Sequence, residues 1–231
     1  MGFRNRMNRA AQTALAALAV AGLAVAMGCS SGEKAETVSE AVESQPTTTV
    51  DVGSEMDDEL TYRVAIIETK FGDITIRFHE ELAPKHTENF IELAEKGFYT
   101  GTTFHRVIPG FVIQGGDPLS KDQTQRERHG TGGPGYTIPA EIGARHVLGA
   151  VAAARLGDQA NPQRRSSGSQ FYICVAPTPM LDNQYSVFGQ VVEGMDVAQK
   201  IAAVRRDPRD NPIEPVYMES VRIETRPMEL P

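Results

Sequence analysis

The sequence predicts a mainly β domain, built as a closed eight-stranded antiparallel β-barrel capped by two α-helices. About eight β-prone segments follow one another from Thr61, and only two stretches have helical apolar periodicity. The strands do not alternate with helices, as parallel β-α-β units would require. A chain of 231 residues, 40% of them hydrophobic, can bury one sizeable core with appendages. We therefore expect one folded domain over residues 61–231.

The first residues have the composition of an export signal. Residues 1–9 carry arginines and no acidic residue, and an alanine-rich apolar run follows over residues 10–27. The run ends in Ala26-Met27-Gly28-Cys29, which resembles a bacterial lipoprotein signal whose cysteine becomes acylated. We predict a signal peptide over residues 1–28 and lipidation of Cys29. An uncleaved transmembrane anchor and a conventional cleaved signal remain as alternatives.

The segment that follows this signal predicts a disordered tether over residues 29–60. It consists mainly of serine, threonine, acidic residues and isolated valines, with no aromatic residue. A flexible coil of about 30 residues has an r.m.s. span of roughly 30 Å. We therefore expect an extracytoplasmic domain, lipid-anchored to a bacterial membrane on its periplasmic side, or to the outer membrane if the source is Gram-negative.

The domain begins with a hairpin and a helix. Residues 63–69 and 74–78 are β-prone and flank a turn at residues 70–73. Pro84 opens a helix predicted to reach Lys96, because proline is tolerated in the first helical turn. The later elements are a small-residue segment at 147–155, strands at 169–175, 186–192 and 216–225, and a helix at 195–204.

The stretch Phe104–Asp117 predicts two short strands that meet at a Pro-Gly bend, because proline fixes φ and glycine permits a positive φ. Strand alternation predicts that Phe111 lies on the face opposite Val112 and Gln114. The bend brings the two strands together. A cationic donor, Arg106, is therefore expected to converge with apolar and amide groups on one concave surface.

Composition excludes several classes of function. The net charge of −7 provides no basic field for nucleic acid, so we expect no nucleic-acid partner. The five histidines are scattered without ligand spacing, which predicts no metal site. Of the two cysteines, Cys29 lies at the signal and Cys174 in an apolar strand, so no disulfide is expected within the domain.

Two motif matches are interpreted as accidental. Residues 130–135 fit the dinucleotide pattern G-x-G-x-x-G, but no strand precedes them and Pro134 disfavours a following helix. A surface loop with special backbone angles explains these glycines. His105, Asp117 and a serine could suggest a hydrolytic triad, yet no G-x-S-x-G elbow is present. We expect no cofactor.

Three motifs in register resemble the cyclophilin family of peptidyl-prolyl cis-trans isomerases, over residues 61–227. The first is the signature stretch FHRVIPGFVIQGGD at residues 104–117. The others are GSQFYI at residues 168–173, and LD at 181–182 followed by VFG at 187–189. A further likeness is to the bacterial branch of the family, carried by the loop 133–136 and the pair Ala154-Arg155.

The resemblance implies an enzyme that isomerises X-Pro bonds in proline-containing peptides and unfolded proteins. Rotation about this amide is slow because its resonance must be broken, with a barrier of roughly 18–20 kcal/mol. By position, Arg106 would donate a hydrogen bond to the prolyl nitrogen, whose lone pair is available only in the twisted amide. The alternative is a proline-peptide binding or chaperone module with incidental isomerase activity.

The resemblance also assigns the other groove residues. Gln114 would hold a substrate carbonyl, and the backbone of Arg155 would pair with the extended peptide. The proline ring would be received by Phe111, Val112, Tyr172 and Leu181. The rim would be completed by His105, Ala154, Gln170, Met180 and Tyr185.

Some positions depart from the family pattern. Met180 replaces a tryptophan and Tyr185 a histidine of many eukaryotic members, so we expect weak cyclosporin binding. Tyr172 stands where phenylalanine is usual, and its hydroxyl needs a partner or solvent. Arg155 replaces an asparagine, and the loop 156–167 is longer than in compact members. We expect a monomer.

Overall fold

The computed structural model describes residues 61–228. The predicted signal peptide, the predicted lipidation at Cys29 and the predicted tether lie outside the described residues. Within residues 61–228, no helix has the length and apolar character that crossing a bilayer requires.

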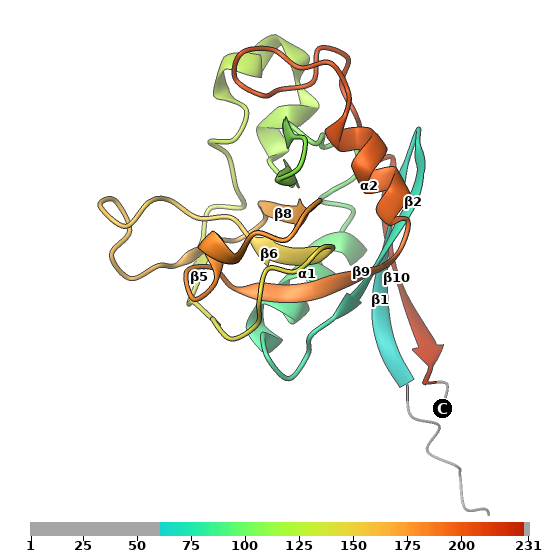
Figure 1. Ribbon diagram of the computed structural model, residues 1–231, viewed down its shortest axis with the longest axis vertical. Coiled ribbons are helices and arrows are strands. Elements are labelled where there is room, and N and C mark those ends of the chain that lie inside the picture. The colour runs from blue at the N-terminus through green and yellow to red at the C-terminus, as the bar shows by residue number, and fades with distance from the viewer. Residues whose placement is uncertain (1–60, 229–231) are drawn as a thin grey trace, which may run out of the picture. The chain divides into compact units, whose positions relative to one another are not determined.

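The described domain consists mainly of strands (Figure 1). The strands are β1 (Thr61–Thr69), β2 (Gly72–Phe78), β3 (Arg106–Ile108), β4 (Val112–Gly115), β5 (Thr137–Ile138), β6 (Ala150–Ala153), β7 (Ser166–Ser167), β8 (Phe171–Cys174), β9 (Val187–Glu193) and β10 (Ser220–Pro227). The helices are α1 (Pro84–Glu95), α2 (Met195–Ala202) and the 3₁₀-helices η1 (Pro118–Lys121), η2 (Gln123–Arg128) and η3 (Pro179–Leu181). The predicted first hairpin and both predicted α-helices are therefore confirmed.

Eight strands form one antiparallel sheet, in the order β10-β1-β2-β9-β6-β8-β4-β3, and β5 pairs separately with β7. Alternation explains how these strands bury one face. In β2, Ile74, Ile76 and Phe78 all enter the main core, while Asp73 and Arg77 are exposed. The mainly β class and the eight antiparallel strands are as predicted.

The sheet is not closed into a barrel, which corrects the sequence prediction. β3 and β10 stand at the two ends of the strand order, and within residues 61–228 no ladder joins them. The segments that precede β3 and β10 are joined by an isolated bridge, between Thr103 and Tyr217, and by backbone hydrogen bonds around it, such as that from the Phe104 N–H to the Val216 carbonyl at 2.9 Å. The outer edge of the short strand β3 is covered by a loop instead, because the Val107 N–H donates to the Asp210 carbonyl over 2.8 Å.

The two α-helices bury one face each in the same core. α1 contributes Phe90 and Ile91, and α2 contributes Ala198 and Ile201. The first turn of α1 begins at Pro84, as predicted, and the carboxylate of Glu141 accepts hydrogen bonds from two of its free N–H groups at 3.1 Å. Both helices are thus held by apolar packing against the sheet.

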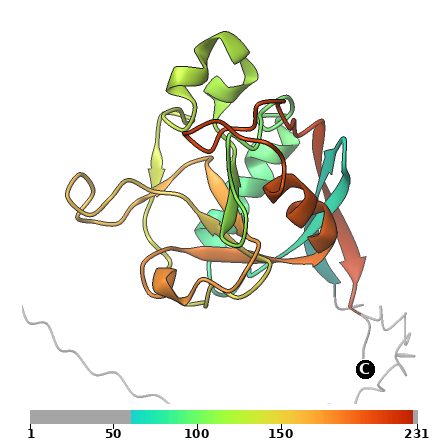
Figure 2. The same ribbon diagram turned by 45° about the horizontal axis from the view of Figure 1, so that its top comes forward.

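The segment between β4 and β6 has more structure than the polar, glycine-rich loop that the sequence predicted. It forms η1, η2 and β5. η2 lies beside the loop 205–213 in both views (Figures 1 and 2). The loop 156–165, between β6 and β7, projects away from the sheet in the same two views.

Candidate active site

The hairpin of β3 and β4 forms one wall of a groove. Its strands pair in the register Arg106–Gln114, Val107–Ile113 and Ile108–Val112. Side chains directly opposite each other in an antiparallel pair project from the same face, so Arg106 and Gln114 meet. The Arg106 Nη1 donates to Gln114 Oε1 over 3.4 Å. The predicted bend is present, with Gly110 at φ 68°.

Phe111 lies on the groove side of this hairpin, which corrects the prediction from strand alternation. β4 begins at Val112, so the pleat does not extend back to Phe111 in the turn. The ring packs against the cluster that contains Val112 and Tyr172. We call Arg106, Phe111, Val112 and Gln114 the hairpin wall.

A chain of amide hydrogen bonds fixes the orientation of Gln114. The Gln170 Nε2 donates to the carbonyls of Gly130 and Gly132, at 2.9 and 2.8 Å. Its Oε1 is therefore free to accept from Gln114 Nε2, at 3.0 Å. The Gln114 Oε1 then faces Arg106. Two backbone carbonyls thus decide which end of the Gln114 amide meets the guanidinium.

The glycine-rich loop is held from its other side by Asp117. This fully buried carboxylate accepts hydrogen bonds from the N–H groups of Leu119, Gly130 and Gly132. A Cβ at Gly132 would overlap the carboxylate. Gly130 and Gly135 have φ values of 90° and 92°, and no helix follows them. These glycines therefore allow close packing and special backbone angles, as predicted.

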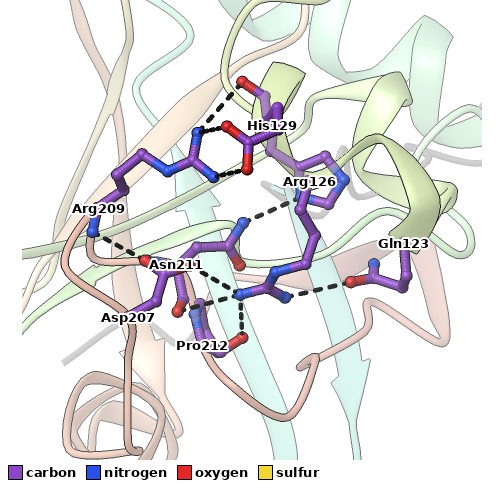
Figure 3. Close-up of polar contacts among 8 residues, drawn as sticks. Gln123, Arg126, His129, Asp207, Arg209, Asn211 and Pro212 are labelled. Atoms are coloured by element: carbon purple, nitrogen blue, oxygen red, sulfur yellow. Dashed lines mark hydrogen bonds and ion pairs between the residues drawn. The ribbon is translucent and has the colours of Figure 1, made fainter.

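A polar cluster between η2 and the loop 205–213 supports β3 from outside (Figure 3). The Arg126 guanidinium donates to Asp207, and to the carbonyls of Asn211 and Pro212 at 3.4 and 2.9 Å. The same loop supplies the Asp210 carbonyl that binds the edge of β3. This cluster therefore fixes the strand that carries Arg106.

The opposite wall comes from segments outside the regular strands. Ala154 follows β6, Leu181 ends η3, and Tyr185 precedes β9. Arg155 stacks on the Tyr185 ring, with Cζ 4.6 Å from the centroid. Its side chain is only 3% exposed and donates to three acceptors, the Gln184 and Leu156 carbonyls and Asp158. We call Ala154, Arg155, Leu181 and Tyr185 the loop wall.

The two walls and Tyr172 enclose a cavity of about 210 Å³. This volume lies below the roughly 300 Å³ at which drug-sized pockets begin, and it suits one side chain. Nine of the twelve predicted groove residues line it, namely Arg106, Phe111, Val112, Gln114, Ala154, Arg155, Tyr172, Leu181 and Tyr185.

Tyr172 has a buried partner that the sequence did not reveal. Its hydroxyl lies 3.0 Å from His146 Nε2, and His146 Nδ1 lies 3.0 Å from Asp182 Oδ1. Burial raises the pKa of Tyr172 and lowers the pKa of His146, while hydrogen bonds from His146 lower the pKa of Asp182. The unusual hydroxyl at residue 172 was the one signal that could have prompted a search for such a partner.

Three predicted rim residues do not line the cavity. Met180 is 63% exposed on η3, and Gln170 lies behind Gln114. His105 is buried, which corrects its predicted place on the rim. Neither of its ring nitrogens has a hydrogen-bond partner of normal geometry, and burial lowers its pKa to about 4 although Asp117 opposes the shift.

Metal-ligating side chains are dispersed in this part of the molecule. Among residues 61–228, no three of the histidine, cysteine and acidic side chains are grouped so that they could hold a metal ion. Cys174 is buried beside Thr178, with 3.3 Å between Sγ and Oγ1, and burial raises the pKa of its thiol. It packs as a small apolar side chain, as predicted.

Comparison with known proteins agrees with this geometry. Residues 64–223 match the family described as cyclophilin type peptidyl-prolyl cis-trans isomerase/CLD. The match covers most of the chain. The chain therefore belongs to the cyclophilin-type peptidyl-prolyl cis-trans isomerases, and it is an isomerase enzyme.

The match between this chain and individual relatives covers nearly the whole length of each relative. Peptidyl-prolyl cis-trans isomerase ppi1 of Schizosaccharomyces pombe is 42% identical over 65% of this chain and 92% of its own. Peptidyl-prolyl cis-trans isomerase B of Streptomyces anulatus is 42% identical over 70% and 97%. A Cryptosporidium parvum cyclophilin has a similar crystal structure, with a TM-score of 0.64 and 28% identity over 72% of this chain and 99% of its own. A second structure of that protein, determined in the presence of the dipeptide Ala-Pro, has a TM-score of 0.62. Both fungal and bacterial relatives occur, so membership of the bacterial branch stays a prediction.

Proposed function

We propose that the cavity between the hairpin wall and the loop wall is the active site. There the enzyme would isomerise X-Pro bonds in envelope proteins or secreted proteins while they fold. The observation that carries this proposal is the half-buried guanidinium of Arg106, which lines the same cavity as the apolar side chains of Phe111 and Leu181. Within the described residues, its side chain makes one hydrogen bond, to Gln114, so its other N–H donors have no partner there.

Arg106 would act by binding the twisted amide better than either planar form. In the planar X-Pro amide the nitrogen lone pair is delocalised, so it accepts no hydrogen bond. Rotation localises the lone pair, and a donor from Arg106 then gains a partner. Such an interaction exists mainly in the transition state, and it therefore accelerates the reaction. The planar guanidinium holds this donor in a fixed direction.

The remaining groups would hold the peptide while the bond rotates. Gln114 uses one Nε2 hydrogen on Gln170 and keeps the second for a substrate carbonyl. Among the hydrogen bonds of residues 61–228, none uses the backbone N–H or carbonyl of Arg155. These two groups are available to an extended peptide. The Ala-Pro dipeptide used with the Cryptosporidium parvum protein is a ligand of the same chemical class.

The test compares wild type with Arg106→Ala in a protease-coupled isomerase assay. We expect kcat/KM to fall about 100-fold, the scale for loss of one transition-state donor. Arg106→Lys should recover part of the loss, because it restores the positive charge without the planar guanidinium. Arg222→Ala, on the exposed strand β10, is the control and should be unaffected. Equal rates for wild type and Arg106→Ala would instead favour a binding or chaperone module.

We also propose that the domain works outside the cytoplasm, anchored through a lipid on Cys29. The support is the sequence alone, an apolar run followed by a small-residue motif and a cysteine. We expect Cys29→Ser to move the protein from membrane to soluble fractions in a bacterial host, measured by fractionation and immunoblotting. Cys174→Ser is the matched control and should stay in the membrane. Retention of Cys29→Ser there would point to the apolar run as the anchor.

Weak cyclosporin binding is part of the same proposal. Met180 and Tyr185 supply no indole N–H at the rim, where the family pattern has a tryptophan donor. Met180→Trp should therefore tighten cyclosporin binding, as measured by calorimetry.

A further inference from the structure

Tyr172, His146 and Asp182 form a hydrogen-bonded series directly behind the cavity. The Asp182 carboxylate accepts the His146 backbone N–H at 2.7 Å and also lies 3.0 Å from Nδ1 of the ring. Because Asp182 is the hydrogen-bond acceptor at Nδ1, the neutral imidazole carries its proton there. Nε2 therefore presents a lone pair to the Tyr172 hydroxyl, at 3.0 Å.

This tautomer fixes the direction of the Tyr172 hydroxyl. The O–H donates to His146, away from the cavity that the Tyr172 ring lines. The His146 side chain is fully buried and does not itself line the cavity. Its ring stacks on Tyr172 at 6.0 Å and 15°, and Tyr185 packs edge-on against Tyr172 at 5.7 Å. The tyrosine ring is thus held from behind and from one side.

We propose that His146 is a positioning residue for the isomerase reaction, which holds the Tyr172 hydroxyl out of the proline pocket so that the pocket wall stays apolar. The inference rests on the proposed function of the cavity. Its content is separate, since it concerns the direction of the Tyr172 O–H bond, which is set by a histidine that does not line the cavity. A tyrosine can then serve at a position where an apolar ring is needed.

The charges around His146 predict how this role depends on pH. Asp182 faces Nδ1, and Tyr172 and Tyr185 contact the ring. Cys174 and Arg155 lie close enough to act on Tyr172, and Arg145 lies close enough to act on Asp182. Burial lowers the pKa of His146 although Asp182 opposes the shift. The ring is therefore neutral above its ordinary value of about 6.5. A ring protonated in more acidic solution has no lone pair at Nε2, so the Tyr172 hydroxyl loses its acceptor.

The first test uses steady-state kinetics with an uncharged Ala-Pro peptide. We expect His146→Leu to raise KM roughly tenfold, the scale for one buried hydroxyl left unpaired, with kcat changed less than about twofold. The Asp182 carboxylate is partly exposed and stays solvated in this variant. Adding Tyr172→Phe removes the orphaned hydroxyl, and the double variant should recover most of the KM increase. A double variant as impaired as His146→Leu would overturn the proposal.

The pH profile separates positioning from simple stability. Wild-type KM should be flat above about pH 6.5 and rise in more acidic solution, and His146→Leu should abolish this rise. His79→Leu is the matched control, since burial also lowers the pKa of His79 but this residue lies outside the cavity. It should keep the wild-type profile. The same profile in His146→Leu and wild type would count against the role.

A readout without catalysis distinguishes this inference from the proposed function. Nitrogen-15 NMR of the imidazole should show an unprotonated Nε2 in wild type at pH 7.5, and a changed signal in Tyr172→Phe. An unprotonated Nδ1 would overturn the inference even if Arg106→Ala abolishes activity. Conversely, full activity in Arg106→Ala would refute the proposed function and leave the NMR result standing.

Discussion

The two walls of the groove are built in different ways. The hairpin wall is held by main-chain ladders to β8 and by the loop that binds the outer edge of β3. The loop wall belongs to no ladder; it has isolated main-chain hydrogen bonds at Ala154 and Leu181, and Arg155 contacts Tyr185 and Asp158 through its side chain. The group proposed to act on the prolyl nitrogen lies on the rigid wall. The difference indicates that substitutions should be costly in the hairpin wall and tolerated in the loop wall.

The largest expected effect on stability comes from a substitution in the turn that follows the hairpin wall. Gly116 has φ 83°, and a Cβ there would overlap the backbone carbonyl of Ser169. Gly116→Ala should therefore lower the free energy of unfolding by at least about 3 kcal/mol. Gly110→Ala is the control, because Gly110 also has a positive φ but open space around it. Gly110→Ala should cost about 1 kcal/mol, and urea titrations of both variants measure the difference. Equal costs would mean that the hairpin wall is not tightly packed.

The next effect is the pH dependence of stability from His105, beside Arg106 in the hairpin wall. Its pKa is about 4 in the folded state, against about 6.5 for the unfolded chain. Between these values the unfolded state binds more protons, so stability is lost as the pH falls. The contribution of His105 to the free energy of unfolding should drop by about 3 kcal/mol from pH 6.5 to 4.

Urea titrations of wild type and His105→Leu at several pH values measure this contribution of His105 to the free energy of unfolding. The variant should show a shallower loss of stability in acid, whatever its absolute stability. Parallel curves for the two proteins would show that His105 is protonated as easily in the folded chain as in the unfolded one.

The smallest expected effect concerns the loop wall. Asp158 is exposed, and its partner Arg155 keeps the carbonyls of Leu156 and Gln184 as acceptors. Asp158→Asn should therefore change kcat/KM by less than about twofold, in line with the small contribution of exposed ion pairs. Arg155→Ala, which removes the whole clamp, is the informative comparison and should raise KM more. A large loss of activity in Asp158→Asn would mean that the loop wall is as constrained as the hairpin wall.

Local patterns predicted much of this molecule. The first hairpin, both α-helices and the Pro-Gly bend follow from short-range periodicity and turn chemistry. The error at Phe111 arose because alternation was extended past the start of β4. His105 was expected on the rim because the family resemblance assigned it there. Whether a strand residue faces the core or a groove depends on where the strand begins, and single-sequence reasoning does not locate that boundary.

The order of the residues was enough to predict the fold class, the antiparallel strands and most of the residues gathered around Arg106. Those features depend on interactions between near neighbours or on motifs that stand intact in the chain. The open sheet is a property of the folded domain alone, because the β3 edge is covered by Asp210 from a distant loop. The pairing of His146 with Tyr172, 26 residues apart, likewise arises only when the elements pack together. Long-range contacts of this kind leave no periodic signal, since they depend on how the elements pack together.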